Sequence, residues 1–221
     1  MIRPFGIQRQ LPPMSEKWIN RFEMKCQHVI VAASLCLAAT FAGCQNREGL
    51  AKDVTGTWQS SPEIVVANDS ADVSLIKSYE FVPEKDAEGA LVVSAMLSIE
   101  KYMPGNGVAP RPFTVSAVAL ASVTGTYEAV SYDKIILHPE ASTFAFSVDS
   151  AAVRCHAAGM AADSLAGFRQ QIAEALQADF FQAVKSSFTR NDTLTQVAMS
   201  DTMISCHIGA DEKTLRLQSP R

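Results

Sequence analysis

The sequence predicts a mainly β fold, an antiparallel barrel or sandwich with one long amphipathic helix, about residues 163–188, inserted before the last strands. From about residue 54 onward, apolar residues recur at every second position in several short segments, which is typical of strands with one buried face. One segment instead repeats its apolar residues every three or four positions, as an amphipathic helix does. About nine short strands separated by turn residues favour a barrel or a sandwich.

The clearest alternation lies in residues 91–99, where Leu91, Val93 and Leu97 share one face and Ser94 shares the other with Ser98. Further strands are predicted at residues 54–58, 78–82, 113–120, 125–130, 134–137, 144–148, 193–199, 202–208 and 214–218. Turns are predicted at residues 83–89, 104–107, 138–140, 191–192 and 209–213, where Gly, Pro, Asn, Asp and charged residues gather.

The predicted helix carries a single apolar stripe. Its members are Leu165, Phe168, Ile172, Leu176, Phe180, Val184 and Phe188. Asp163 or Ser164 can accept hydrogen bonds from the free amides of the first turn. The polar face holds few cations, so we expect the helix to pack across the sheet or the barrel mouth and not on a membrane surface.

The N-terminal region has the parts of an export signal, starting at Met24. A short polar start precedes an apolar run over residues 29–42, and small residues then precede a cysteine. A transmembrane helix needs about 20 apolar residues and this run is shorter, which favours a signal over a permanent anchor. Residues 1–23 fit no part of the signal and are expected to be disordered, as an upstream extension or as the result of a misassigned start codon.

The residues Phe41-Ala42-Gly43-Cys44 resemble the lipobox of bacterial lipoproteins. The resemblance implies a signal peptide at residues 24–43, its removal, and acylation of Cys44 by groups such as palmitate. Several acyl chains, at about 0.8 kcal/mol per buried methylene, would make membrane attachment effectively permanent.

The resemblance also implies a location in the cell envelope. Gln45 after the lipidated cysteine resembles the pattern of an outer-membrane destination, in either the periplasmic or the surface leaflet. Residues 44–53 are polar and small, which predicts a tether, and residues 54–221 are predicted to form a single domain.

The charge of the mature chain disfavours nucleic acid as a partner. Residues 1–43 hold five basic and two acidic residues, so the totals of 19 and 23 fall to 14 and 21, a net charge of −7. A polyanion would be repelled by this charge. The partners expected are the membrane, through the acyl chains, together with a small apolar ligand or an envelope protein.

Two cysteines remain besides Cys44 in the mature chain. In an oxidising envelope, Cys155 and Cys206 would form one disulfide. Two other interpretations stay open, namely buried free thiols and a zinc or copper site completed by His156 and His207. Adjacent residues on a strand point to opposite faces, which disfavours the metal site.

Four short motifs carry a second resemblance. They are Gly56-Thr57-Trp58, Tyr79-Glu80-Phe81, Gly125-Thr126-Tyr127 and Lys134-Ile135-Ile136-Leu137. Together they resemble the lipocalin-like β-barrel lipoproteins of Bacteroidota. The resemblance implies a ligand-binding or structural envelope lipoprotein without catalytic residues. The predicted helix departs from this pattern, because the long helix of a lipocalin follows the whole barrel.

Five aromatic residues are the candidate lining of a ligand cavity, and they could equally fill the core: Trp58, Phe81, Phe113, Phe144 and Phe146. No catalytic motif was found, and no enzyme activity, cofactor or metal site is predicted. We therefore expect a lipoprotein that binds a small apolar ligand or serves as an envelope accessory. The alternatives are a structural or interaction partner of an envelope complex and a metal- or stress-sensing lipoprotein.

Overall fold

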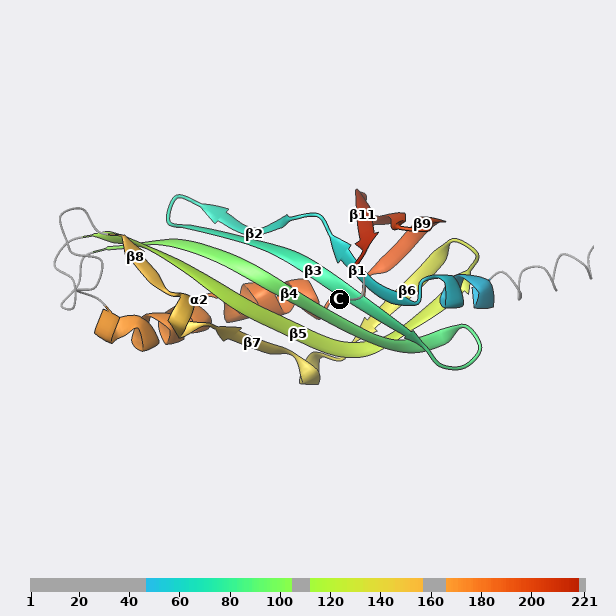
Figure 1. Ribbon diagram of the computed structural model, residues 1–221, viewed down its shortest axis with the longest axis horizontal. Coiled ribbons are helices and arrows are strands. Elements are labelled where there is room, and N and C mark those ends of the chain that lie inside the picture. The colour runs from blue at the N-terminus through green and yellow to red at the C-terminus, as the bar shows by residue number, and fades with distance from the viewer. Residues whose placement is uncertain (1–46, 105–111, 157–165, 219–221) are drawn as a thin grey trace, which may run out of the picture. The chain divides into compact units, whose positions relative to one another are not determined.

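Eight antiparallel strands close into a barrel in the part of the chain that the computed structural model describes, residues 47–104, 112–156 and 166–218. The order around the barrel is β1, β11, β10, β9, β6, β5, β4 and β3, and β3 pairs with β1 again (Figure 1). In chain order these strands are β1 (Gly56–Ser60), β3 (Ala71–Pro83), β4 (Glu88–Met103), β5 (Phe113–Ser131), β6 (Lys134–Pro139), β9 (Thr193–Ser200), β10 (Met203–Ile208) and β11 (Asp211–Leu217).

Three of these strands, β3, β4 and β5, continue beyond the barrel. All 13 residues of β3 pair with β4, and all 16 residues of β4 pair with β5. The extension is widened by β2 (Glu63–Asn68) along β3 and by β7 (Ala145–Val148) and β8 (Arg154–His156) along β5. The same sheet therefore forms a closed barrel at one end and an open half-barrel at the other.

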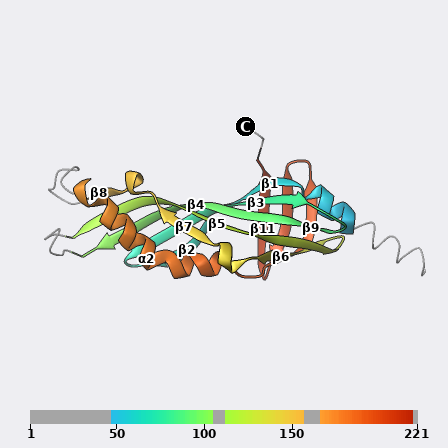
Figure 2. The same cartoon turned by 90° about the horizontal axis from the view of Figure 1, so that it is seen from below.

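The long helix α2 (Arg169–Phe188) fills the half-barrel, preceded by the short helix η3 (Ala166–Phe168). It contacts β2, β5 and β7 and runs along the long strands (Figure 2). Its buried residues are Ile172, Ala173, Leu176, Phe180, Val184 and Phe188. The helix and its position before the last strands are confirmed, whereas its predicted start and the caps Asp163 and Ser164 lie outside the described residues.

Residues 47–53 are helical, and we call them the N-terminal helix. Leu50, Ala51 and the following Val54 are buried in the barrel core. The Trp58 Nε1–H donates a 2.7 Å hydrogen bond to the Val54 carbonyl oxygen. The prediction of a tether over residues 44–53 is therefore wrong for the described part, because an apolar face was concealed among polar neighbours.

The core follows the predicted alternation, but several strands differ in their bounds, and β4, β6 and β11 extend into the predicted turns 83–89, 138–140 and 209–213. Residues 113–120 and 125–130 belong to one strand, β5, because Ala121 and Val123 between them also face the core. Strand β3 begins at Ala71, earlier than predicted, and β2 and β8 were not predicted. The predicted class is confirmed: the fold is a mainly β, lipocalin-like antiparallel barrel with a helix inserted before its last strands.

Two glycines allow the barrel to close. Gly56 begins β1 with a φ of +124°, a conformation that side chains other than glycine rarely adopt. A Cβ atom on Gly125 would lie 2.2 Å from the His138 carbonyl oxygen of β6, so only glycine fits there. Both glycines begin the motifs on which the lipocalin-like resemblance was based.

Candidate functional site

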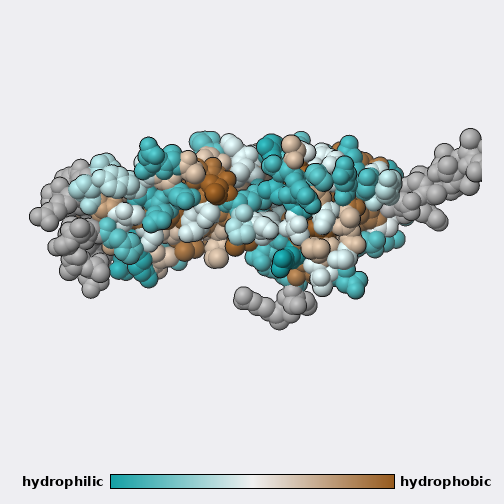
Figure 3. All heavy atoms as spheres, turned by 90° about the horizontal axis from the view of Figure 1, so that it is seen from above, coloured by the Kyte–Doolittle hydropathy of each residue, from teal (hydrophilic) through white to brown (hydrophobic). Residues whose placement is uncertain are grey.

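A hollow of about 480 Å³ lies on the outer face of the long strands, and we call it the outer groove. Residues of β1, β3, β4, β5 and β7 line it. Side chains alternate between the faces of a strand, so Ile76 and Ser78 face the groove while Lys77 between them faces the interior. Seen from above, the surface of the domain is mixed, and apolar patches emerge between hydrophilic side chains (Figure 3).

Three apolar side chains form a row across the outer groove. Ile76 of β3 pairs directly with Met96 of β4, and Met96 pairs directly with Leu120 of β5. Side chains opposite each other in a sheet are about 5 Å apart, so the three make one continuous apolar strip. Met96 is 59 % exposed and Leu120 is 58 % exposed. Grouped apolar exposure of this kind is typical of a contact site for a ligand or partner.

A row of hydroxyl groups runs beside the apolar row. Ser78, Ser94 and Ser122 are paired in register on the same three strands. Each hydroxyl can donate one hydrogen bond and accept others. The outer groove therefore offers an apolar strip and a polar strip side by side, an arrangement that suits a molecule with an apolar part and a hydrogen-bonding part.

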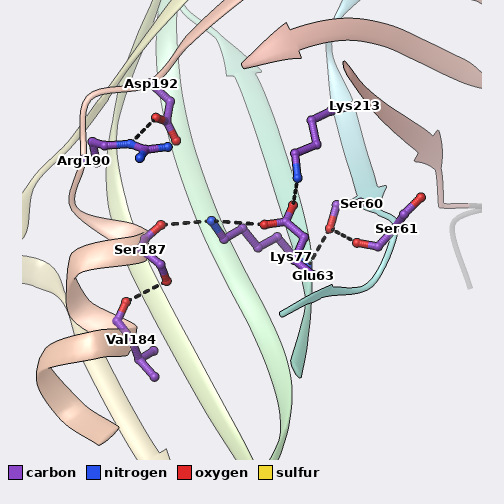
Figure 4. Close-up of polar contacts among 9 residues, drawn as sticks. All are labelled: Ser60, Ser61, Glu63, Lys77, Val184, Ser187, Arg190, Asp192 and Lys213. Atoms are coloured by element: carbon purple, nitrogen blue, oxygen red, sulfur yellow. Dashed lines mark hydrogen bonds and ion pairs between the residues drawn. The ribbon is translucent and has the colours of Figure 1, made fainter. Parts of the chain in front are cut away.

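Behind the outer groove, on the inner face of the sheet, lies a group of polar side chains that we call the junction cluster. Its members are Glu63, Lys77, Arg190, Asp192 and Lys213 (Figure 4). Figure 4 shows Lys77 at its centre, between the C-terminal end of α2 and Glu63 of β2. The Lys77 Nζ donates a 2.9 Å hydrogen bond to the Ser187 carbonyl oxygen and lies 3.9 Å from a Glu63 carboxylate oxygen. Lys213 of β11 lies 3.4 Å from the other oxygen. The cluster thus joins the barrel to the helix-filled half.

Burial dominates the electrostatics of the junction cluster. It lowers the pKa of Lys77, although Glu63 opposes this effect. Burial also raises the pKa of the neighbouring Tyr79. The pKa of Arg190 is raised because its guanidinium donates a 2.7 Å hydrogen bond to Asp192.

The junction cluster has little room for a ligand. The hollow beside Lys77 and Tyr79 measures about 10 Å³, which is space for roughly one water molecule. The Lys77 amine also lies 5.3 Å from the centre of the Phe188 ring, so helix residues cover it. This arrangement fastens α2 to the sheet, and among the described residues the outer groove is the better candidate for binding.

The five aromatic residues predicted to line a cavity do not share one. Trp58, Phe81, Phe113 and Phe146 are each at most 6 % exposed. Phe81 contacts the ring of Tyr127 edge to face in the barrel, with ring centroids 5.0 Å apart. Phe113 begins β5 at the opposite end of that strand from the barrel.

The remaining two aromatics lie near the helix. Phe144 packs edge to face against Phe181 of α2, with ring centroids 5.6 Å apart. Phe146 borders the outer groove, but it pairs with the core-facing Ala121 and is only 6 % exposed, so its ring faces the interior. The predicted set therefore fills the core and does not line the candidate site.

Both cysteine sulfurs are free in the structure, so the predicted disulfide between Cys155 and Cys206 is not formed. Cys155 lies on β8, which pairs with β5 as far as Ser116, whereas β6 pairs with β5 only from Gly125 onward. A strand rises about 3.3 Å per residue, so these places on β5 are roughly 30 Å apart. Cys206 is on β10, two strands further around the barrel than β6. The two cysteines are therefore much further apart than the ~7 Å Cα separation that a disulfide allows.

The same separation removes the basis for a shared zinc or copper site. His156 follows Cys155 on β8 and His207 follows Cys206 on β10, so the two pairs belong to different halves of the sheet. Within residues 47–104, 112–156 and 166–218, no group of three or more His, Cys, Asp or Glu side chains could hold a metal ion.

The sequence contained signals for both sites that strand alternation alone did not reveal. Met96 and Leu120 stand on the polar faces of their strands, so each interrupts the alternation around it. Lys77 stands between Leu75 and Tyr79 on a core face, which marks a buried charge.

Comparisons with protein-family models and with curated proteins found no match to this chain. The fold and the groove define the class: an antiparallel, lipocalin-like barrel with an apolar hollow on its outer face. None of the helices in the described ranges is long and apolar enough to cross a bilayer.

Proposed function

We propose that the chain is a lipid-anchored lipoprotein of the cell envelope whose barrel domain binds an apolar or amphiphilic small molecule in the outer groove. The export signal and the sequence ending in Cys44 support the anchor. Gln45 supports the outer membrane as the destination.

The observation that carries the binding proposal is the apolar row of Ile76, Met96 and Leu120, with Met96 and Leu120 exposed, within a hollow of about 480 Å³. Ligand pockets commonly measure about 300–1,000 Å³ and combine apolar walls with a few polar groups. The adjoining serine row supplies such polar groups. The packed rings of Phe81 and Tyr127 favour this outer site over a ligand inside the barrel.

The anchor is tested by feeding cells radiolabelled palmitate. Wild-type protein is expected to incorporate the label and to sediment with membranes. The variant Cys44→Ser is expected to do neither, because it lacks the acylated sulfur. A wild-type chain that remains unlabelled in the cytosolic fraction would contradict the proposal.

The binding site is tested with the neutral fluorescent probe N-phenyl-1-naphthylamine on the purified domain. Leu120→Asp is expected to weaken binding by about tenfold or more, equivalent to roughly 1.4 kcal/mol, because it places a charge in the apolar row. Ile64→Asp is the matched control, since Ile64 is 69 % exposed on β2 but does not line the groove. Equal effects of both variants would rule out the outer groove as the site.

A further inference from the structure

We propose that the barrel end that carries the N-terminal helix rests on the surface of a lipid bilayer, so that the half-barrel projects away from the membrane. This inference rests on the proposed acylation of Cys44. It goes further, because it states which surface of the folded domain contacts lipid.

The short chain between Cys44 and the N-terminal helix limits how far the domain can lie from its anchor. The helix is described from Arg47 onward, so only Gln45 and Asn46 separate it from Cys44. An extended residue spans at most about 3.6 Å, so the Cα atoms of Cys44 and Arg47 are within roughly 11 Å of each other. The sequence predicts a tether over residues 44–53 that holds the domain away from the membrane. Because residues 47–53 are helical and packed on the barrel, most of this segment cannot serve as a tether.

Hydrogen bonds identify the turns that share this end of the barrel. The Tyr127 hydroxyl of β5 donates a 3.1 Å hydrogen bond to the Ala51 carbonyl oxygen of the N-terminal helix. Two residues further along β5, the Ala129 amide donates to the Ala87 carbonyl oxygen in the β3–β4 turn, at 2.8 Å. The β5–β6 turn follows at once and contains Tyr132.

The opposite side of the barrel reaches the same end. The Gln218 amide donates a 2.9 Å hydrogen bond to the carbonyl oxygen of Thr57, which closely follows the N-terminal helix. The Leu217 amide donates at the same distance to Thr202 in the β9–β10 turn. Three turns, the end of β11 and the N-terminal helix therefore surround one end of the barrel.

Exposed apolar side chains occur around this end, and we call them the rim: Val82, Tyr132, Met203 and Leu217. Tyr132 is 68 % exposed at the tip of its turn, where a packed core gives no reason for an aromatic ring. Tyrosine is favoured at the headgroup level of membranes, because its ring is apolar and its hydroxyl is polar. The rim thus has the chemistry of a shallow lipid contact beside a covalent anchor.

Charges at this end are mixed. The turn residues Glu84, Lys85 and Asp86 and the pair Asp133 and Lys134 place both signs around the rim, with acidic groups slightly in excess. Attraction to anionic lipid therefore contributes little. The partner that fits is a zwitterionic bilayer surface, contacted through apolar side chains and the acyl chains.

The test uses the full-length protein, processed and lipidated in cells, and reconstituted into phosphatidylcholine vesicles. A nitroxide spin label is attached at Tyr132→Cys, or at Ile64→Cys as a control of matched exposure, 68 % against 69 %. Both variants carry Cys155→Ser, and the buried Cys206 is protected from labelling. Relaxation by dissolved oxygen and by a water-soluble nickel chelate is then compared with and without vesicles.

The label at position 132 is expected to gain severalfold in its ratio of oxygen to nickel accessibility on reconstitution, while the label at position 64 keeps its ratio. If the protein floats with the vesicles and both labels respond alike, the orientation is wrong although the anchor is present. If the wild-type protein does not float at all, the proposed acylation fails instead.

Discussion

Lys77 is the residue on which the junction between the two halves depends. Its amine is held by the Ser187 carbonyl oxygen at the end of α2 and by Glu63 of β2. Burial lowers its pKa below 10.5, the value for an exposed lysine, so the unfolded chain binds more protons than the folded chain in the alkaline range. The free energy of unfolding therefore gains a contribution that rises with pH between the folded-state pKa and pH 10.5.

The variant Lys77→Met tests this account. At pH 7 we expect it to lower the free energy of unfolding by about 1–3 kcal/mol, because the Ser187 carbonyl oxygen loses its donor. The difference from wild type should widen toward pH 10, since only wild type gains the lysine contribution. Urea unfolding of both proteins at the two pH values measures it. A difference that does not change with pH would contradict the lowered pKa.

The groove residues were not predictable from alternation, for a physical reason. Strand periodicity sorts residues by face, and it identifies the core face by the apolar residues that recur on it. Met96 and Leu120 are apolar residues on the solvent side of their strands, so they interrupt the alternation, and the pattern gives no reason for their presence there. Lys77 is the converse, a charge on the core side that is stable only because distant residues, Ser187 and Glu63, meet it.

At the level of elements, the closure of the barrel depends on close approach of β5 and β6 at Gly125. The Cβ atom of an alanine there would overlap backbone atoms of His138 and Pro139, which cannot rotate away. Gly49 in the N-terminal helix is the opposite case, because a Cβ atom there would meet nothing within 4 Å. Glycine is therefore a steric requirement at position 125, whereas at position 49 it only carries the conformational entropy cost of a glycine in a helix.

We expect Gly125→Ala to destabilise the fold by roughly 2–3 kcal/mol or more, because backbone atoms of two strands must separate. Gly49→Ala is expected to stabilise it by about 0.5–1 kcal/mol, since glycine in a helix is conformationally costly. Thermal unfolding followed by circular dichroism compares the two. Similar changes of the same sign would show that the strand contact does not limit closure.

Element types were more predictable than element lengths. The stripe through Leu176 and Phe180 predicted α2, because three-to-four spacing has no other common explanation. The polar residues around Leu50 concealed the N-terminal helix, since two buried residues are too few to establish a period. The break expected within β5 is absent because the alternation simply continues through Val123.

Across the whole molecule, the two free cysteines mark the two halves of the sheet, Cys155 in the half-barrel and Cys206 in the barrel. Burial raises the pKa of the Cys206 thiol from 9.0 to about 11, and it also raises the pKa of Cys155. A thiol with a raised pKa holds little of the reactive thiolate at neutral pH. The sequence could not exclude a disulfide, because cysteine number and compartment say nothing about separation in space.

Alkylation with iodoacetamide under non-reducing conditions tests this arrangement. In the native mature domain at pH 8, the half-buried Cys155 is expected to react slowly and Cys206 not at all. After unfolding in guanidinium without reductant, both should be alkylated, as mass spectrometry of the intact protein would report. Absence of alkylation after unfolding would mean that the two sulfurs are bonded.

The strands β3, β4 and β5 run through both halves without interruption, so neither half possesses a complete set of strands. No linker exists within this sheet at which one half could melt while the other survives. Heat or denaturant should therefore unfold the domain in one cooperative transition, with α2 and the barrel disappearing together. A destabilising substitution in the groove, which lies on these same strands, should therefore lower the stability of both halves of the sheet.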